Sequence, residues 1–316
     1  MARYFLKRIL WLIPTVLCVA ILIFSLMHFV PGDPAKGLLG VDATDAEIEA
    51  KRIELGLDKP FLVQLGKYLY DTFIRFDFGK SYVSKALIGP NLLQRLKRTA
   101  ILGSIGTTLG MALGLLLGVS AAVHANKWQD RLCILISLVG VSMPAFWLAL
   151  MLMLVFVVKI RIFPASAILG WKGWVLPCLS VALSCMALFA RQVRSSMLEV
   201  IRADYVTTAR AKGLPRRIVI YGHTLPNAMV PILAVFGLFF ASVFAGSIVI
   251  ETIFGIPGIG LYLVTGINTR DYPVVQSCVV VVSLLICLIL ILVDFLYALI
   301  DPRIKARYAK GGRRRK

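Results

Sequence analysis

The sequence predicts an all-α integral membrane protein with six membrane-spanning helices, and two observations carry this prediction. Of its 316 residues, 59% are hydrophobic and only 16% are charged, with a mean hydropathy of +0.84. A soluble domain usually has about 45–50% apolar and about 25% charged residues. The apolar residues are also gathered into six long runs. Only helices and closed barrels satisfy the backbone inside lipid, and runs this long and continuous indicate helices.

The first run is a membrane helix rather than a cleaved signal peptide, because it has 22 residues and is followed by Pro31-Gly-Asp-Pro34 instead of a small-x-small site. The fourth run has 16 residues, which is short for a hydrocarbon core of about 30 Å unless the helix starts near Gly170. The six runs are Ile9–Val30, Ala100–Val123, Leu132–Val158, Val175–Ala190, Ala228–Ile250 and Val274–Leu299.

The basic residues predict that both termini are cytoplasmic. Lys and Arg outnumber Asp and Glu by 35 to 16, and they lie between and after the apolar runs, which is typical of a membrane protein rather than a nucleic-acid-binding one. With both ends inside, the cytoplasmic loop 191–227 holds seven basic residues and the external segment 251–273 holds one. Residues 1–30 then form the cytoplasmic N-terminus and first span, and 301–316 form a basic cytoplasmic tail that contacts anionic headgroups.

Residues 31–99 are expected to be an external helical loop, followed by a five-span core over 100–300. Thr44 and Glu47 form a capping box for a first helix, with Gly56 as its stop, and Phe61–Ile74 follows Pro60 as a second, amphipathic helix.

The segment Gly79-Lys80-Ser81 resembles the last three residues of a phosphate-binding loop, but Ile74 occupies the place of the first glycine that such a loop requires. We therefore expect no cofactor on this chain. The cysteines form no Cys-x-x-Cys pair and the three histidines are far apart, so we expect no metal site.

The second run carries a row of glycines spaced by four residues, which places them on one face of a helix. Small residues at this spacing let a neighbouring helix approach closely in lipid, so we expect this face to pack against another helix. The row consists of Gly106, Gly110, Gly114 and Gly118.

The polar loop 191–227 contains the clearest functional pattern. Glu199–Lys212 reads as a helix that Gly213 ends with a left-handed cap. After Leu214 and Pro215, Arg216–Gly222 reads as a second short helix, and Leu225-Pro226 leads into the fifth span. Physical reasoning alone leaves two interpretations open: a rigid basic knob that a cytoplasmic partner binds, or an ordinary amphipathic linker.

Three further features of the spans admit two interpretations each. The fifth span is followed by Phe254, and Gly255, Pro257 and Gly258 then interrupt the helix. This segment is either a candidate external gate, with Phe254 as its plug, or a simple turn. Pro144 is expected to kink the third span rather than act as a hinge. For Asp294 in the last span, we favour a polar contact at the membrane interface or with another subunit over a role in an ion relay.

The motifs as a set resemble the permeases of the peptide/nickel ABC importer family. Thr207, Thr208 and Ala209 before Gly213, with Leu225-Pro226 after it, are similar to the Glu-Ala-Ala-x-x-x-Gly loop of ABC permeases, although Thr207 and Thr208 replace its Glu and first Ala. The resemblance runs from residue 1 to about Arg307. The other matching segments are Asp204–Leu214, Glu251–Gly258, Arg270–Gln276, Leu299–Arg303, Pro31–Pro34 and Asp77–Gly79.

The resemblance implies a type I importer permease fold in the bacterial or archaeal inner membrane. It implies a second permease subunit, two cytoplasmic ABC ATPases that hold ATP and Mg, and an extracytoplasmic substrate-binding protein. It assigns Thr207, Thr208, Ala209, Gly213, Leu214, Pro215, Leu225 and Pro226 to an ATPase-coupling loop, and it implies no catalytic residue.

The expected function is ATP-driven import of di- or oligopeptides, with nickel or another small solute as the alternative cargo. A stand-alone secondary transporter or channel would need inward ionisable residues in several spans, and Asp294 is the only one found deep in a span. An intramembrane enzyme would need a Ser/His pair, paired Asp residues or His-Glu-x-x-His inside the spans, and the sequence has none of these.

Overall fold

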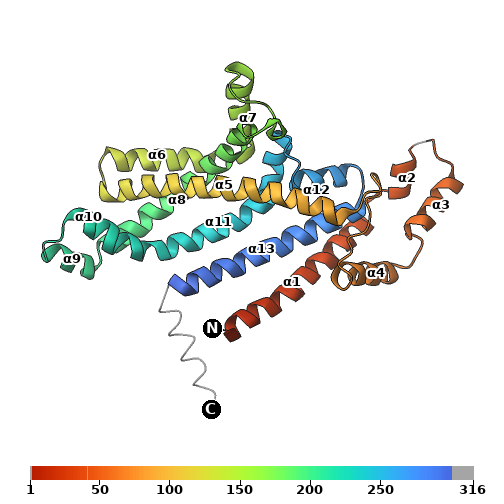
Figure 1. The fold of residues 1–316 in the computed structure, drawn as a ribbon, viewed down its shortest axis with the longest axis horizontal. Helices are drawn as coiled ribbons and strands as arrows, with labels where there is room; N and C mark the ends of the chain where they lie inside the picture. Colours follow the sequence, from red (N-terminus) through yellow and green to blue (C-terminus); the bar gives the residue numbers. More distant parts are fainter. Residues whose placement is uncertain (1, 41, 301–316) are drawn as a thin grey trace, which may run out of the picture. The chain divides into compact units, whose positions relative to one another are not determined.

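The computed structural model describes residues 2–40 and 42–300, and within these ranges the regular structure is helical apart from one antiparallel bridge between Lys80 and Leu87. The all-α prediction is therefore confirmed for these ranges. Figure 1 shows the helices in the order of the sequence, and the chain divides into two compact units. The core unit contains residues 2–6, 100–256 and 288–300, and the loop unit contains residues 7–40, 42–99 and 257–287. The expected basic tail, 301–316, lies outside the described residues.

Five helices are long and apolar enough to cross a membrane, and a bent helix pair makes a sixth span if it is counted as one. This agrees with the six predicted runs. The five helices are α1 (Ala2–Phe29), α5 (Ile88–Val123), α8 (Lys172–Ile201), α11 (Leu225–Ile253) and α13 (Tyr272–Ile300), and the bent pair is α6 (Trp128–Ser142) with α7 (Ala145–Met153).

Helices α5 and α8 are longer than the apolar runs that predicted them. Helix α5 begins at Ile88 rather than Ala100, and α8 runs from Lys172 to Ile201 instead of 175–190. The reason is that polar residues can extend a helix at its ends, whereas hydropathy marks only the part that lipid can cover. The early start of α8 near Gly170 removes the concern about its length.

The third span is broken rather than simply kinked at Pro144. Helices α6 and α7 meet at 97°, and Met143 between them is extended, with φ −82° and ψ 124°. Proline lacks the amide hydrogen that the helix needs and pushes the preceding residue out of the helical region. After α7 the chain continues as a π-helical turn over Leu154–Lys159, and a short 3-10 turn, Ala167–Leu169, precedes α8.

The core unit is built around α8. Its buried face packs against α6, α7 and α11, and Phe189 on α8 lies 5.9 Å and 5.7 Å, between ring centroids, from Phe236 and Phe239 on α11. Figure 1 shows α9 (Asp204–Ala211) and α10 (Arg216–Ile218) together at one end of this unit. The core unit therefore holds the predicted coupling segment at the end of its longest helices.

The loop unit contains four shorter helices besides parts of α1, α5 and α13. Thr44 caps α3 as predicted: its backbone amide donates to Glu47 at 2.8 Å, and the Glu47 amide donates back to its hydroxyl at 3.4 Å. The hydrogen bonds to Thr44 lower the pKa of Glu47. Gly56 ends α3 with φ 70°. The four helices are α2 (Pro34–Leu39), α3 (Asp45–Leu55), α4 (Phe61–Phe73) and α12 (Ile259–Asn268).

Candidate functional site

The segment between α8 and α11 differs from the predicted helix pair in two ways. The predicted helix Glu199–Lys212 is interrupted at Arg202 and Ala203, so that Glu199 belongs to α8 and a separate helix α9 begins at Asp204. The second predicted helix, Arg216–Gly222, is not a separate element. Helix α10 passes through a π-helical turn, Val219–Thr224, directly into α11. Gly222 lies within this stretch, but it is inside the π-helical turn and is not one of the glycines with a positive φ, so it does not cap a helix and the backbone continues into α11.

Gly213 makes the sharp turn between α9 and α10, and its φ of +75° agrees with the predicted left-handed cap. Lys212 ends α9, and Pro215 precedes α10 with φ −61° and ψ 143°. A side chain at φ +75° costs about 1–2 kcal/mol, which explains a glycine there. A Cβ at Gly213 would meet no atom within 4 Å, so backbone conformation alone imposes the requirement.

The predicted coupling residues divide into an exposed tip and an anchored base. Thr207, Thr208, Gly213, Pro215 and Pro226 are exposed. Ala209 is buried with Val206 and Val219, and Leu214 lies against this cluster, while Leu225 packs partly against the neighbouring core. Leu214 therefore belongs to the anchored base, whereas Pro215 belongs to the exposed tip.

Two polar contacts between residues far apart in the sequence hold this end of the core unit together. Asp130 on α6 is 2% exposed and accepts hydrogen bonds from the Arg194 guanidinium on α8, one of them at 2.9 Å from Nη2. Arg216 donates from Nη2 to the carbonyl of Val123, the last residue of α5, at 2.8 Å. The partners in these two contacts are 64 and 93 residues apart in the sequence, so no local sequence pattern pairs them.

The glycine face of α5 lies against α8. A Cβ added at Gly110 would come within 2.5 Å of the Ala182 carbonyl oxygen and of the Cys185 Cβ. At Gly106, Gly114 and Gly118 the nearest α8 atom would be 2.6 Å away. Cβ atoms essentially never approach so closely, so any side chain in this row has to push the two helices apart.

The segment after α11 is buried within the core unit as far as Ile256. Phe254 is 1% exposed and Ile256 is fully buried, and both belong to the same apolar cluster as Leu176 and Val243. Gly255 between them has φ 60°. Glu251, one turn earlier, is fully buried and accepts a hydrogen bond from the Ser247 hydroxyl at 3.2 Å. This segment is therefore an irregular backbone packed inside protein, which is where such backbone is tolerated at membrane depth.

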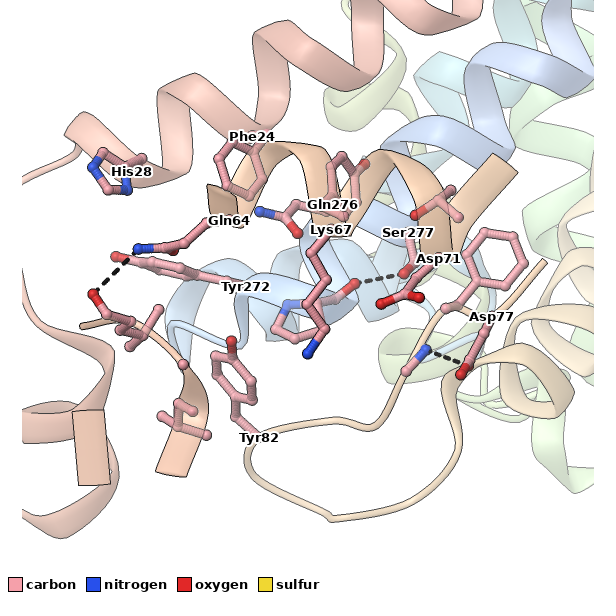
Figure 2. A pocket seen from close by; sticks show the side chains of 18 of the residues that line it. Phe24, His28, Gln64, Lys67, Asp71, Asp77, Tyr82, Tyr272, Gln276 and Ser277 are labelled. Atoms are coloured by element: carbon pink, nitrogen blue, oxygen red, sulfur yellow. Dashed lines mark hydrogen bonds between the residues drawn. The ribbon is translucent and has the colours of Figure 1, made fainter. Parts of the chain in front are cut away.

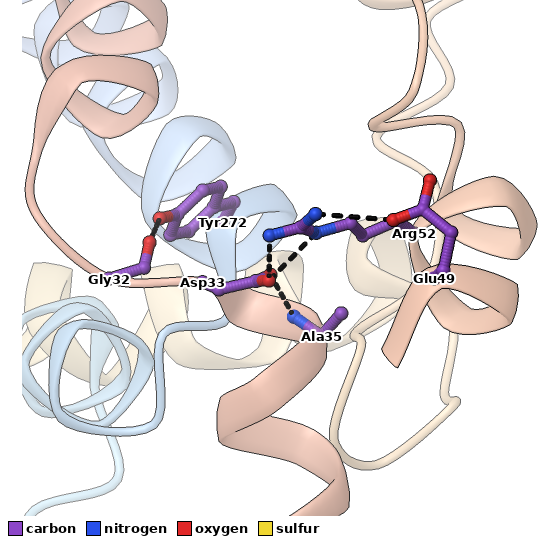
Figure 3. Close-up of polar contacts among 6 residues, drawn as sticks. All are labelled: Gly32, Asp33, Ala35, Glu49, Arg52 and Tyr272. Carbon is purple, nitrogen blue, oxygen red and sulfur yellow. Dashed lines mark hydrogen bonds and ion pairs between the residues drawn. The ribbon is translucent and has the colours of Figure 1, made fainter. Parts of the chain in front are cut away.

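The loop unit is stabilised by a second group of polar contacts, which Figure 3 shows. Asp33 caps α2 by accepting from the Ala35 amide at 2.9 Å, and it also pairs with Arg52 of α3 at 2.7 Å. Arg52 reaches Glu49 at 3.2 Å, and the Tyr272 hydroxyl donates to the carbonyl of Gly32 at 3.3 Å. The motif Pro31–Pro34 is thus joined to the motif that begins at Arg270.

Asp271 fixes the loop that follows α4. Its carboxylate is 3% exposed and accepts from the Ser81 hydroxyl at 2.5 Å, the Tyr82 amide at 3.0 Å and the Val83 amide at 3.4 Å. Burial, with the nearby charge of Asp271, raises the pKa of Tyr82 to about 12. Ser81 and Asp271 are 190 positions apart in the chain, so no local sequence pattern connects them.

A cavity of about 270 Å³ opens in the loop unit beside these contacts (Figure 2). Its wall brings together α4, the loop after it and the first turns of α13. Gln276 from α13 is 8% exposed, and Lys67 and Asp71 from α4 line the same space. The described residues contain no group of three or more His, Cys, Asp or Glu side chains placed to hold a metal ion.

Two family models together match nearly the whole chain. Residues 114–306 match the binding-protein-dependent transport system inner membrane component, and residues 1–112 match the N-terminal region of such membrane components.

Similar full-length relatives are glutathione transport system permease proteins. The chain is 40% identical over 305 residues to GsiC of Salmonella paratyphi A and of Salmonella typhimurium, and 39% identical to GsiC of Escherichia coli. Each match covers 96% of this chain and 99% of the relative.

Two solved transporters share the fold. Inward-facing MetNI, a methionine ABC transporter, superposes with a TM-score of 0.54 and 20% identity, covering 68% of this chain and 96% of that one. An amino acid ABC transporter solved with histidines gives a TM-score of 0.51 and 17% identity, covering 68% and 94%. At such identities the likeness concerns the fold, which is that of the type I importer permeases.

Proposed function

The chain belongs to the binding-protein-dependent inner membrane transport components, the permease subunits of ABC importers, and from this premise we propose how it works. It forms half of a translocation pathway beside a second permease subunit. Two cytoplasmic ATPases bind ATP and Mg and supply the energy, and an extracytoplasmic binding protein delivers the substrate. This chain contributes an element with two stable arrangements, and ATP binding and hydrolysis shift the balance between them.

The coupling site in this proposal is the exposed tip formed by Thr207, Thr208, Gly213 and Pro215. Two observations support this assignment: the tip lies at the end of the core unit, and it is joined to the anchored base. An ATPase that binds the tip can move α11 directly, because α10 continues through the π-helical turn into α11. In this orientation both termini are cytoplasmic and residues 31–99 are external.

At the other end of α11, residues 254–258 act as the external gate. Their burial and the positive φ of Gly255 support an irregular segment held between packed helices rather than an exposed turn. The loop unit serves as the docking surface for the binding protein, because the contacts of Asp33 and Asp271 hold its segments in a defined conformation.

The proposed substrate is a short peptide, of which glutathione is one example. The observation that carries this is the 40% identity to glutathione permeases over 96% of the chain. Nickel or another small solute is the second candidate on the same scaffold, because the binding protein, a different chain, usually makes the first selection. A stand-alone transporter or channel would work without an ATPase.

Uptake by reconstituted vesicles tests this proposal. The chain is purified with its second permease subunit, its ATPases and the binding protein encoded beside it. Labelled glutathione, a dipeptide and Ni²⁺ are then offered with and without ATP inside. We expect ATP-dependent uptake of glutathione or the dipeptide that needs the binding protein. Uptake of Ni²⁺ alone would replace the substrate class, and uptake without ATP or ATPase would contradict the importer.

A further inference from the structure

A second cavity, of about 470 Å³, lies in the core unit between the last turns of α5 and the segment from Arg216 to Leu225. Its inner wall is apolar and includes Leu116, Val119 and Leu225. Its mouth is polar and carries Arg216, Arg217 and His124. The apolar wall belongs to the membrane-spanning part of α5, and the mouth lies where that span ends at Val123. The cavity is thus amphipathic along the direction of the span.

The charge at the mouth is strongly positive. Neither Arg216 nor Arg217 pairs with an acidic side chain within residues 2–40 and 42–300. The hydrogen bond from Arg216 to the Val123 carbonyl fixes that side chain across the end of α5 and leaves further donors of its guanidinium for a ligand. Two arginine side chains that line the same cavity at the edge of a membrane span suit a phosphate diester.

The apolar wall continues along α5 into the depth of the membrane. Ile105 and Leu109 are 51% and 40% exposed, and Leu116, at the cavity itself, is 70% exposed. Two exposed aromatic residues, Tyr221 in the cavity wall and Trp128 at the start of α6, are of the kind enriched at headgroup level. A soluble peptide or nucleotide would leave this stripe uncovered, whereas an acyl chain would cover it.

We propose that this cavity binds one anionic phospholipid. Arg216 and Arg217 hold its phosphate, and one acyl chain lies along the exposed stripe Ile105, Leu109 and Leu116. The assignment of the site to the cytoplasmic leaflet rests on the orientation proposed above, but the binding site itself does not.

Native mass spectrometry of the assembled transporter tests the proposal. The complex is released from phosphatidylcholine nanodiscs that contain phosphatidylglycerol, and retained phosphatidylglycerol is counted. Arg217→Gln should reduce retention about fivefold, the effect of one basic residue near a membrane surface. Arg202→Gln is the matched control, since Arg202 is an exposed arginine at the end of α8 outside the cavity lining. It should retain phosphatidylglycerol like the unchanged complex.

Three results would overturn the proposal. Equal retention by Arg217→Gln and the unchanged complex would exclude a role for the cavity mouth, and an equal loss in Arg202→Gln would indicate diffuse surface charge. Displacement of the lipid by soluble glycerol phosphate would make a free phosphate ester the occupant. A photo-reactive residue at Leu116 should label lipid; labelling of the second permease subunit instead would show that a helix fills the groove. None of these readouts depends on uptake, so they are separate from a failure of the proposed transport function.

Discussion

Two glycines show how one residue type meets two different needs in this chain. At Gly213 the backbone has φ +75° and the space around a Cβ is empty, so the requirement is conformational. At Gly110 the backbone is ordinary helix, but a Cβ would touch the α8 backbone. The first glycine shapes a turn and the second allows two helices to approach.

The turn leads to a prediction at residue scale. Gly213→Val should leave insertion intact but reduce uptake at least several-fold, because a β-branched side chain disfavours the left-handed turn by about 1–2 kcal/mol and displaces Pro215. Gly213→Asn should retain most uptake, because Asn tolerates this conformation. Uptake and ATPase activity of the reconstituted complex are measured, with the membrane level of the subunit as reference.

Gly222→Ala provides the matched control, since Gly222 lies in the helical segment after α10 and a Cβ there makes an ordinary 3.7 Å contact with Ile218. Normal uptake by Gly213→Val would remove the coupling role of the turn. Loss of Gly213→Val from the membrane would make Gly213 a folding residue instead.

At this scale the sequence reveals features whose partners are close along the chain. The Thr44–Glu47 box, the Gly56 stop and the φ of Gly213 all follow from local rules and are confirmed. The Asp130–Arg194 and Asp271–Ser81 contacts join residues 64 and 190 positions apart, and no local rule pairs them. They become visible only when the helices are placed in space.

At the scale of elements, hydropathy located each span but not its ends. The break at Pro144 was predicted in position and underestimated in angle, because a proline rule says where a helix is disturbed and the packing of α7 on α8 decides how far it turns. The sequence predicts Arg216–Gly222 as a separate short helix, with Leu225-Pro226 leading into the fifth span. A proline in the first turn of a helix is also compatible with a continuous one, and here the segment continues.

The loop held by Asp271 gives a prediction about one element. Asp271→Ala leaves the Ser81 hydroxyl and two backbone amides without their acceptor, which costs about 1–3 kcal/mol per buried group. Trypsin should therefore cleave after Lys80 and Lys85 about tenfold faster than in the unchanged protein. Mass spectrometry of the fragments measures the two cleavage rates, and cleavage after Lys51 serves as an internal reference.

Asp58→Ala is the control for this experiment, because Asp58 is an exposed acidic residue of the same unit that takes no part in the Asp271 hydrogen bonds to the loop. Its cleavage rates should equal those of the unchanged protein. If Asp271→Ala also resists cleavage at Lys80 and Lys85, then contacts other than the carboxylate hold the loop.

At the scale of the whole molecule, composition was sufficient for the fold class and the motifs for the family. The partition into two units was not foreseen, since residues 257–287 group with residues 7–99 only through tertiary contacts. The substrate also lies beyond the reach of the sequence, because in the proposed mechanism the binding protein, a different chain, makes the first selection.

The proposed orientation gives a prediction for the whole chain. In a background without native cysteines, a membrane-impermeant thiol reagent should label Asp45→Cys in intact cells and should not label Lys310→Cys until the cells are opened. The charge of the short loops is the physical reason. Lys310 lies outside the described residues, so only its side of the membrane is at issue. The reverse labelling pattern would invert the topology.

The unbroken helix from Arg216 to Ile253 has a mechanical consequence. Its 38 residues form a rod roughly 57 Å long at about 1.5 Å per residue, nearly twice the thickness of a hydrocarbon core. A rod of this length works as a lever: a tilt of one degree at one end displaces the other by about 1 Å. Its irregular points are the π-helical turn at Val219–Thr224 and Pro231 inside α11, and both lie in the half of the helix that begins at Arg216. In the proposed mechanism, a small tilt at the end that the ATPase contacts therefore becomes a larger displacement at Phe254.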